Sequence, residues 1–266
     1  MRQHKRIGME GRSGVNIVKY LKRIGLGETE LNTDAQCLSL LQTSHLLAVP
    51  FENLDIHWKR PIILDTGRSY KKIVEGKRGG FCYELNGLFN ELLRDIGFRT
   101  RIVSARVYNG TDFGPEFDHA AIIATIGELE YLVDVGFGDF AAEPLRIVPD
   151  IEQNDREGVF VIRRGDFGTL EVLKSSDEGW RPQYSFTMLG RELSEFAEMC
   201  DFQQYSPDSH FTRGRMCSIL TETGRKTVTD SKFLITENGA KTEYAVNSSE
   251  EFDRLLNDEF GIRQIQ

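Results

Sequence analysis

The chain has 266 residues with 39% hydrophobic and 10% aromatic content, which is enough for a packed core in one large domain or two to three small ones. A net charge of −8 argues against general binding to nucleic acid or to an anionic membrane surface. No apolar run is long enough to cross a bilayer, and the four cysteines are too scattered for a zinc site or a disulfide framework. We therefore expect a cytoplasmic protein without a metal.

The first hundred residues are predicted to be mostly helical. The basic segment 1–13 has no apolar core behind it, so we expect an arm and not a secretory signal, with Met9 as a candidate alternative start. Apolar residues then recur at helical spacing over 14–25 and over 37–46. Pro50 ends this pattern, and residues 68–75 favour a further short helix.

Cys82 lies at the start of the next predicted helix. Apolar residues recur at 3.6-residue spacing from Leu85 to Ile96, and Gly97 is a C-terminal stop signal. The free N–H groups and dipole of a first helical turn favour an anion, so we expect the Cys82 thiol to ionise easily. Gly79 and Gly80 would leave the approach to the sulfur open. A cysteine simply packed in a core is the alternative.

Residues after Gly97 are predicted to form an antiparallel sheet or small barrel, followed by a mixed C-terminal segment. Gly190 is read as a break before a helix over 191–202, and Ser248 is expected to cap a last helix that ends near Phe260. The predicted strands cover 99–107, 119–126, 129–137, 158–163, 169–173, 183–188, 216–220, 225–228 and 233–236.

Two of these strands bring a histidine and an aspartate together. If Gly127-Glu128 is a two-residue type II′ turn, partner numbers sum to 255 and Asp134 lies opposite Ala121. His119 then lies diagonal to Asp134 on the same face, within side-chain reach. A slip of one residue would put them on opposite faces.

These residues predict a nucleophile, a base and an orienting group. His119 would take the proton of Cys82, and Asp134 would fix the tautomer of the imidazole. The alternatives are an outward-facing Asp134 on an edge strand and a His119 satisfied at a loop end. Among the other histidines, we expect His45 to be a hydrogen-bonded core residue, and His210 lies in a polar loop that could face a ligand.

Several sequence motifs between residues 20 and 260 belong together: Tyr20-Leu-Lys-Arg-Ile-Gly25, Pro50-Phe-Glu-Asn-Leu54, Arg78-Gly-Gly-Phe-Cys-Tyr-Glu-Leu-Asn86, Asp118-His119, Val133-Asp-Val-Gly-Phe-Gly138, and Ser206-Pro207 with Ser209 and Phe211. In these motifs the sequence resembles the arylamine N-acetyltransferases. The chain lacks the long middle insertion of animal members, so the resemblance is to the bacterial type.

The resemblance implies an α+β fold with a papain- or transglutaminase-like catalytic core. A helical domain over 1–97 would carry the cysteine, a central antiparallel β-barrel over 98–203 the histidine and aspartate, and 204–266 would form an α/β lid. It also implies a Cys82-His119-Asp134 triad that moves acetyl from acetyl-CoA to arylamines, arylhydrazines or hydrazides by a ping-pong route. Acetyl-CoA would be a co-substrate, with no bound cofactor.

The resemblance further implies roles for residues around the triad. Glu52 would pair with Arg78 to brace the catalytic loop. Contacts with substrate or CoA would come from Phe51, Val107, Phe137, Gly138 and Phe211. Local cations must hold the anionic CoA, and the candidates are Arg213, Arg215, Arg225 and Lys226.

Two other functions stay open on the sequence. One is a cysteine amidase of the transglutaminase or papain kind, which would use the same triad on a different acyl donor. The other is a catalytically silent binding module that keeps the fold.

Overall fold

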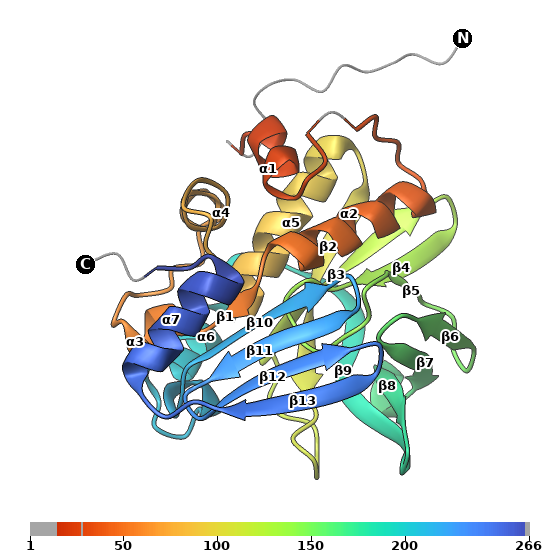
Figure 1. Ribbon diagram of the computed structural model, residues 1–266. Helices are drawn as coiled ribbons and strands as arrows, with labels where there is room; N and C mark the ends of the chain where they lie inside the picture. The colour runs from red at the N-terminus through yellow and green to blue at the C-terminus, as the bar shows by residue number, and fades with distance from the viewer. Residues whose placement is uncertain (1–14, 28, 264–266) are drawn as a thin grey trace.

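The computed structural model describes residues 15–27 and 29–263, which form two antiparallel sheets and a group of helices (Figure 1). The predicted mixed α+β class is confirmed. The predicted arm, with His4 and Met9, lies outside the described residues. No helix within these ranges is both long and apolar enough to span a membrane.

The helices lie mainly in the first hundred residues. The predicted short helix over 68–75 is confirmed: α4 begins at Thr66 and continues from Lys71 as a wider π-type helix that ends at Glu75. The described helices are α1 (Ile17–Arg23), α2 (Ala35–Ala48), α3 (Leu54–His57), α4 (Thr66–Tyr70), α5 (Cys82–Ile96), α6 (Ala197–Tyr205) and α7 (Ser249–Phe260).

The larger sheet has eight strands in the order β5-β4-β3-β2-β9-β8-β7-β6. Its two ends meet where the Gln153 side chain of β6 hydrogen bonds to the backbone N–H and C=O of Arg146 on β5, at 2.7 and 3.0 Å, so that the sheet is nearly closed into a barrel. The strands are β2 (Arg99–Val107), β3 (His119–Ile126), β4 (Leu129–Val133), β5 (Leu145–Arg146), β6 (Glu152–Asp155), β7 (Gly158–Arg164), β8 (Leu170–Ser176) and β9 (Gly179–Arg191).

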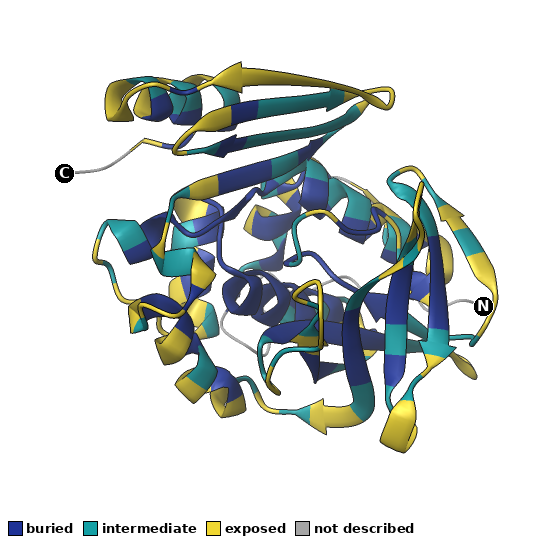
Figure 2. Ribbon diagram, turned by 90° about the horizontal axis from the view of Figure 1, so that it is seen from below, coloured by how far each residue is buried: buried dark blue, intermediate teal, exposed yellow. Residues whose placement is uncertain are grey.

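The smaller sheet combines one strand from the N-terminal part of the chain with four strands from the C-terminal part. Its order is β1-β10-β11-β12-β13, and α7 packs on it (Figure 1). The outermost strand, β13, is exposed along its whole length (Figure 2). The strands are β1 (Phe51–Glu52), β10 (Met216–Thr221), β11 (Gly224–Thr229), β12 (Lys232–Glu237) and β13 (Ala240–Ala245).

Several predicted boundaries are wrong for identifiable reasons. Gly190 does not break the chain, because β9 continues to Arg191 across a bulge in its pairing with β2. The strand predicted to reach residue 137 ends at Val133, where the chain turns inward. β1, β5, β6 and β13 were not predicted, since β1 and β5 have two residues each and β6 and β13 have little apolar character.

Helix α5 is the centre of the molecule. Most of its side chains are buried, and it packs against β2 and β3 on one side and the other N-terminal helices on the other. Burial of a full leucine or phenylalanine side chain contributes about 1.5–3 kcal/mol, so this apolar face holds α5 firmly. The first turn of α5 is thereby fixed against the barrel.

Candidate active site

Cys82 is the first residue of α5 and its side chain is buried. The helix begins where the Phe81 backbone N–H donates to the Glu84 carboxylate over 2.9 Å, which satisfies one of the free donors of the first turn. The predicted position of Cys82 at a helix start is confirmed.

The β3–β4 hairpin has the predicted register. Ile122 pairs with Val133, so partner numbers sum to 255. Gly127 has a φ of +61°, and Glu128 does not have a positive φ, which fits a type II′ turn and not a type I′ turn. Asp134 follows the last paired residue. His119 Nε2 lies 2.7 Å from Asp134 Oδ2, and both side chains are buried.

Three further groups hold the Asp134 carboxylate. The Asn86 side chain donates to Oδ1 over 2.9 Å, the Gly136 N–H donates to the same oxygen over 2.9 Å, and the Tyr184 hydroxyl donates to Oδ2 over 3.1 Å. Asn86, Gly136 and Tyr184 have no role predicted from the sequence. Asn86 had a readable signal, because it lies four residues after Cys82 and therefore on the same helix face.

A glycine is required where the hairpin meets α5. A Cβ on Gly136 would lie 2.9 Å from Cys82 Cα and 2.7 Å from Asn86 Nδ2, closer than side chains pack.

The predicted role of Gly79 is wrong, because a Cβ there would lie 2.2 Å from the Pro50 carbonyl oxygen. Gly79 serves the packing of β1 against the catalytic loop and does not clear a path to the sulfur.

The predicted easy ionisation of Cys82 is opposed by its surroundings. Burial raises the pKa of this thiol well above its usual value, and the nearby Cys200, Asp118 and Asp134 raise it further. A hydrogen bond from the Tyr83 backbone N–H acts in the other direction but is weaker. The helix start alone therefore does not produce a thiolate, and a nearby proton acceptor is needed.

A buried charge cluster lies behind the loop that precedes Cys82. Arg78 donates to Glu52 Oε1 at 2.5 and 3.1 Å and to Asp55 Oδ1 at 3.0 Å. Lys72, for which no role was predicted, lies 2.7 Å from both Asp55 Oδ2 and Glu84 Oε2. Glu84 also caps α5, so the cluster connects β1, α3, the π-type turn that follows α4 and the helix that carries Cys82.

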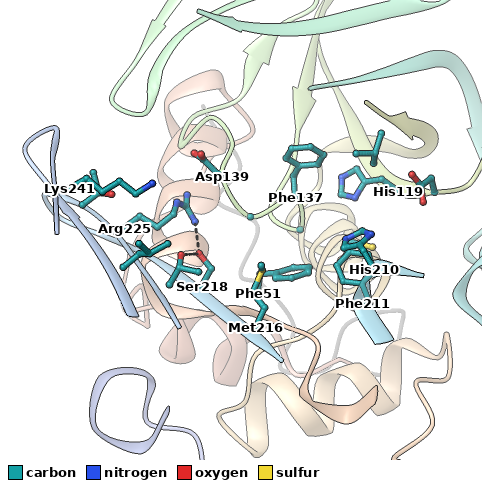
Figure 3. A pocket seen from close by; sticks show the side chains of 18 residues that line it. Phe51, His119, Phe137, Asp139, His210, Phe211, Met216, Ser218, Arg225 and Lys241 are labelled. Atoms are coloured by element: carbon teal, nitrogen blue, oxygen red, sulfur yellow. Dashed lines mark hydrogen bonds between the residues drawn. The ribbon is translucent and has the colours of Figure 1, made fainter. Parts of the chain in front are cut away.

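A cavity of about 400 Å³ opens beside Cys82 and His119 (Figure 3). One end holds His119, Phe137, His210 and Phe211, while Phe51 and Met216 lie in the middle. All five residues predicted for substrate or CoA line it, namely Phe51, Val107, Phe137, Gly138 and Phe211. Asp134, Glu52 and Arg78 lie behind the wall and do not line it.

The opposite end of the cavity is polar and contains two cations. Arg225 and Lys241 line it together with Asp139 and Ser218 (Figure 3). Of the four predicted cations only Arg225 is there. Arg213, Arg215 and Lys226 do not line the cavity, and they contact the Asp208 carbonyl, Asp230 and Glu259, respectively. Arg225 lines the cavity although it also pairs with Glu157 over 3.4 Å.

Two further histidine predictions have clear outcomes. His45 is fully buried in the core, with Nδ1 3.0 Å from the Tyr20 hydroxyl, so the predicted structural role is confirmed. His210 lines the cavity, and its ring lies 3.7 Å from that of Phe211 between centroids. Burial and the charge of Arg213 lower the pKa of His210, which favours a neutral imidazole.

The sequence and the fold are similar to those of known proteins. The family model described as N-acetyltransferase matches residues 34–265. The arylamine N-acetyltransferase, pineal gland isozyme NAT-10, of Gallus gallus is 30% identical, with 93% of this chain and 94% of the relative aligned.

Two solved bacterial structures are also similar. The Salmonella typhimurium arylamine N-acetyltransferase superposes with a TM-score of 0.87 at 28% identity, covering 92% of this chain and 90% of the other. The Mycobacterium marinum arylamine N-acetyltransferase in complex with CoA gives 0.85 at 27% identity, covering 92% of each chain. This chain therefore belongs to the arylamine N-acetyltransferase family.

Proposed function

We propose that this protein transfers an acetyl group from acetyl-CoA to arylamines, arylhydrazines or hydrazides through an acetyl-Cys82 intermediate. The observation that carries the proposal is the 2.7 Å contact between His119 Nε2 and Asp134 Oδ2, beside a cavity that Cys82 and His119 both line. The buried carboxylate stabilises an imidazolium, so His119 can accept the proton that the Cys82 thiol must lose.

The first half-reaction is acyl transfer to sulfur. His119 takes the proton of Cys82, and the thiolate attacks the thioester carbonyl carbon of acetyl-CoA. Backbone N–H groups at the start of α5 stabilise the tetrahedral oxyanion. The carbonyl–sulfur bond to CoA then breaks, and the departing CoA thiolate takes the proton from His119.

The second half-reaction returns the enzyme to its starting form. After CoA has left, the acceptor nitrogen attacks the carbonyl carbon of acetyl-Cys82. His119 removes one proton from this nitrogen as the bond forms, and returns it to the sulfur of Cys82 as the thioester breaks. The sum is one acetyl group exchanged for one N–H proton, without a metal or redox step.

The polar end of the cavity suits the phosphates of CoA. Arg225 and Lys241 are the cations that line it, and Phe51 and Met216 offer apolar surface between them and Cys82. The Mycobacterium marinum relative with CoA supports binding of this co-substrate by the same fold. We place the thioester at Cys82 and the anionic half of CoA toward Arg225.

A steady-state screen tests the activity. Purified protein, with Cys82→Ala as the control, is given acetyl-CoA and a panel of arylamines, hydrazines and hydrazides, and free CoA is measured. We expect parallel lines in double-reciprocal plots and no turnover in the variant. Release of CoA by Cys82→Ala at the wild-type rate, or turnover of amide substrates without acetyl-CoA, would overturn the proposal in favour of another chemistry.

A further inference from the structure

We propose that the Asp118 carboxylate selects the acceptor, favouring arylamines that carry a positive charge over those that carry a carboxylate. The proposal deepens the acetyl-transfer function and depends on it. Asp118 immediately precedes His119 and lines the same cavity as Cys82 and His119. It is partly exposed there, so an acceptor that approaches acetyl-Cys82 passes a carboxylate.

Asp118 is held by buried polar groups. Gln203 Nε2 donates to Asp118 Oδ1 over 2.6 Å, and Ser209 Oγ donates to Gln203 Oε1 over 2.6 Å. Burial raises the pKa of Asp118, while the charge of His119, a hydrogen bond from the Val107 backbone and the hydrogen bond from Gln203 lower it. Gln203 and Ser209 are both buried, and Ser209 also accepts from the Phe211 N–H. The carboxylate and the aromatic wall at Phe211 are thus set by one hydrogen-bonded chain.

The backbone before Asp118 is also fixed. Phe117 has a φ of +67°, an unfavourable conformation for a bulky residue that persists only when its surroundings hold it. Its N–H donates to Ser104 Oγ over 2.7 Å, its carbonyl accepts from the Tyr83 hydroxyl over 2.8 Å, and its ring packs on Phe196. Asp118 therefore has a defined position, as recognition of a charge requires.

The charge of Asp118 has no fixed cation to cancel it. Asp139, which also lines the cavity, pairs with Lys174 over 2.8 Å. Over the ranges 15–27 and 29–263, no lysine or arginine forms an ion pair with Asp118, and the charge that acts on its carboxylate is that of His119. The two cations of the lining, Arg225 and Lys241, belong to the smaller sheet. An ionised Asp118 therefore gives the part of the cavity beside Cys82 and His119 a negative charge that no ion pair neutralises.

A pair of acceptors of opposite charge tests this inference. We would measure kcat/KM for 4-aminobenzoate and for 4-amino-N,N,N-trimethylanilinium at saturating acetyl-CoA. In Asp118→Asn, kcat/KM for the anionic acceptor should rise and kcat/KM for the cationic acceptor should fall. The ratio of the two values, cation over anion, should therefore drop by about 100-fold or more. The ratio is insensitive to a general loss of active enzyme. Asp112→Asn, an exposed acid of the same loop outside the cavity, should keep the wild-type ratio.

Two further measurements keep the inference separate from the proposed activity. Acetylation of Cys82 by acetyl-CoA alone does not involve the acceptor, so failure of that reaction in the wild type would refute the activity itself. If Cys82 is acetylated but the ratio in Asp118→Asn stays within about threefold of wild type, only the selectivity is refuted. Gln203→Leu, which frees the carboxylate, should shift the ratio in the same direction by a smaller factor, and no shift would contradict the positioning role of Gln203.

Discussion

Asn86 donates to Asp134 Oδ1 over 2.9 Å and so joins the helix that carries Cys82 to the hairpin that carries His119. The same side chain donates to the Ala120 carbonyl over 2.6 Å and accepts from the Val135 N–H over 3.0 Å. One amide thus sets both the distance between the two elements and the direction of the Asp134 carboxylate.

Asn86→Ala should therefore lower both stability and activity. Loss of three buried hydrogen bonds that leaves their partners unsatisfied should reduce the free energy of unfolding by about 1–3 kcal/mol and kcat/KM by at least about tenfold. Denaturant unfolding and steady-state kinetics measure the two effects. Asn90→Ala, one turn further along α5, is the control, and an equal loss of activity in both variants would contradict a specific role for Asn86.

His119→Ala should leave Cys82 protonated at neutral pH. Because burial and nearby acidic groups raise the pKa of this thiol, removal of the proton acceptor should confine the thiolate to pH values well above about 8.5. The wild-type pair should instead react with iodoacetamide below neutrality. Alkylation rates at a series of pH values measure this, and equal profiles for the two proteins would show that His119 is not the base.

The site could be read from the sequence where its determinants are local. The register of His119 and Asp134 followed from one turn and the alternation of two adjacent strands. Cys82 followed from helical spacing. Tyr184 could not be assigned, because its contact with Asp134 spans fifty residues and depends on how β9 pairs with β2.

The predictions for Cys82 and Gly79 were wrong because they depend on packing between segments far apart in the sequence. The ease of ionisation predicted for Cys82 assumed a helix start near water, but the barrel buries it. The role predicted for Gly79 assumed open space, but β1 fills it. The division into domains over 1–97, 98–203 and 204–266 stays a prediction. The pairing of β1 with β10 joins the first of these segments to the last.

His45 should make the fold sensitive to acid. Burial lowers its pKa to about 3, whereas the unfolded chain has the ordinary value of 6.5. As the pH falls between these values only the unfolded state gains this proton, so stability should fall by about 1.4 kcal/mol per pH unit and by up to about 5 kcal/mol in total. In urea unfolding between pH 6.5 and 4, His45→Asn should remove the part of the pH dependence of the unfolding free energy that corresponds to one proton. An unchanged slope would show that other groups cause the acid sensitivity.

Arg225→Gln should weaken acetyl-CoA binding without changing the acceptor step. A lost contact between a cation and a phosphate should raise KM for acetyl-CoA by about tenfold. Activity with p-nitrophenyl acetate, a donor without phosphates, should stay near wild type. Lys226→Gln is a neighbouring control whose cation pairs with Glu259 outside the cavity. An equal rise of KM in both variants would indicate a nonspecific charge effect.

Formation and discharge of acetyl-Cys82 test the central claim most directly. Protein is incubated with acetyl-CoA labelled in the acetyl group, freed of small molecules, digested and analysed by mass spectrometry, and a second portion is chased with an arylamine. We expect the label on Cys82 alone and its quantitative transfer to the amine. Label on another residue, or label on Cys82 that the amine does not remove, would contradict the account.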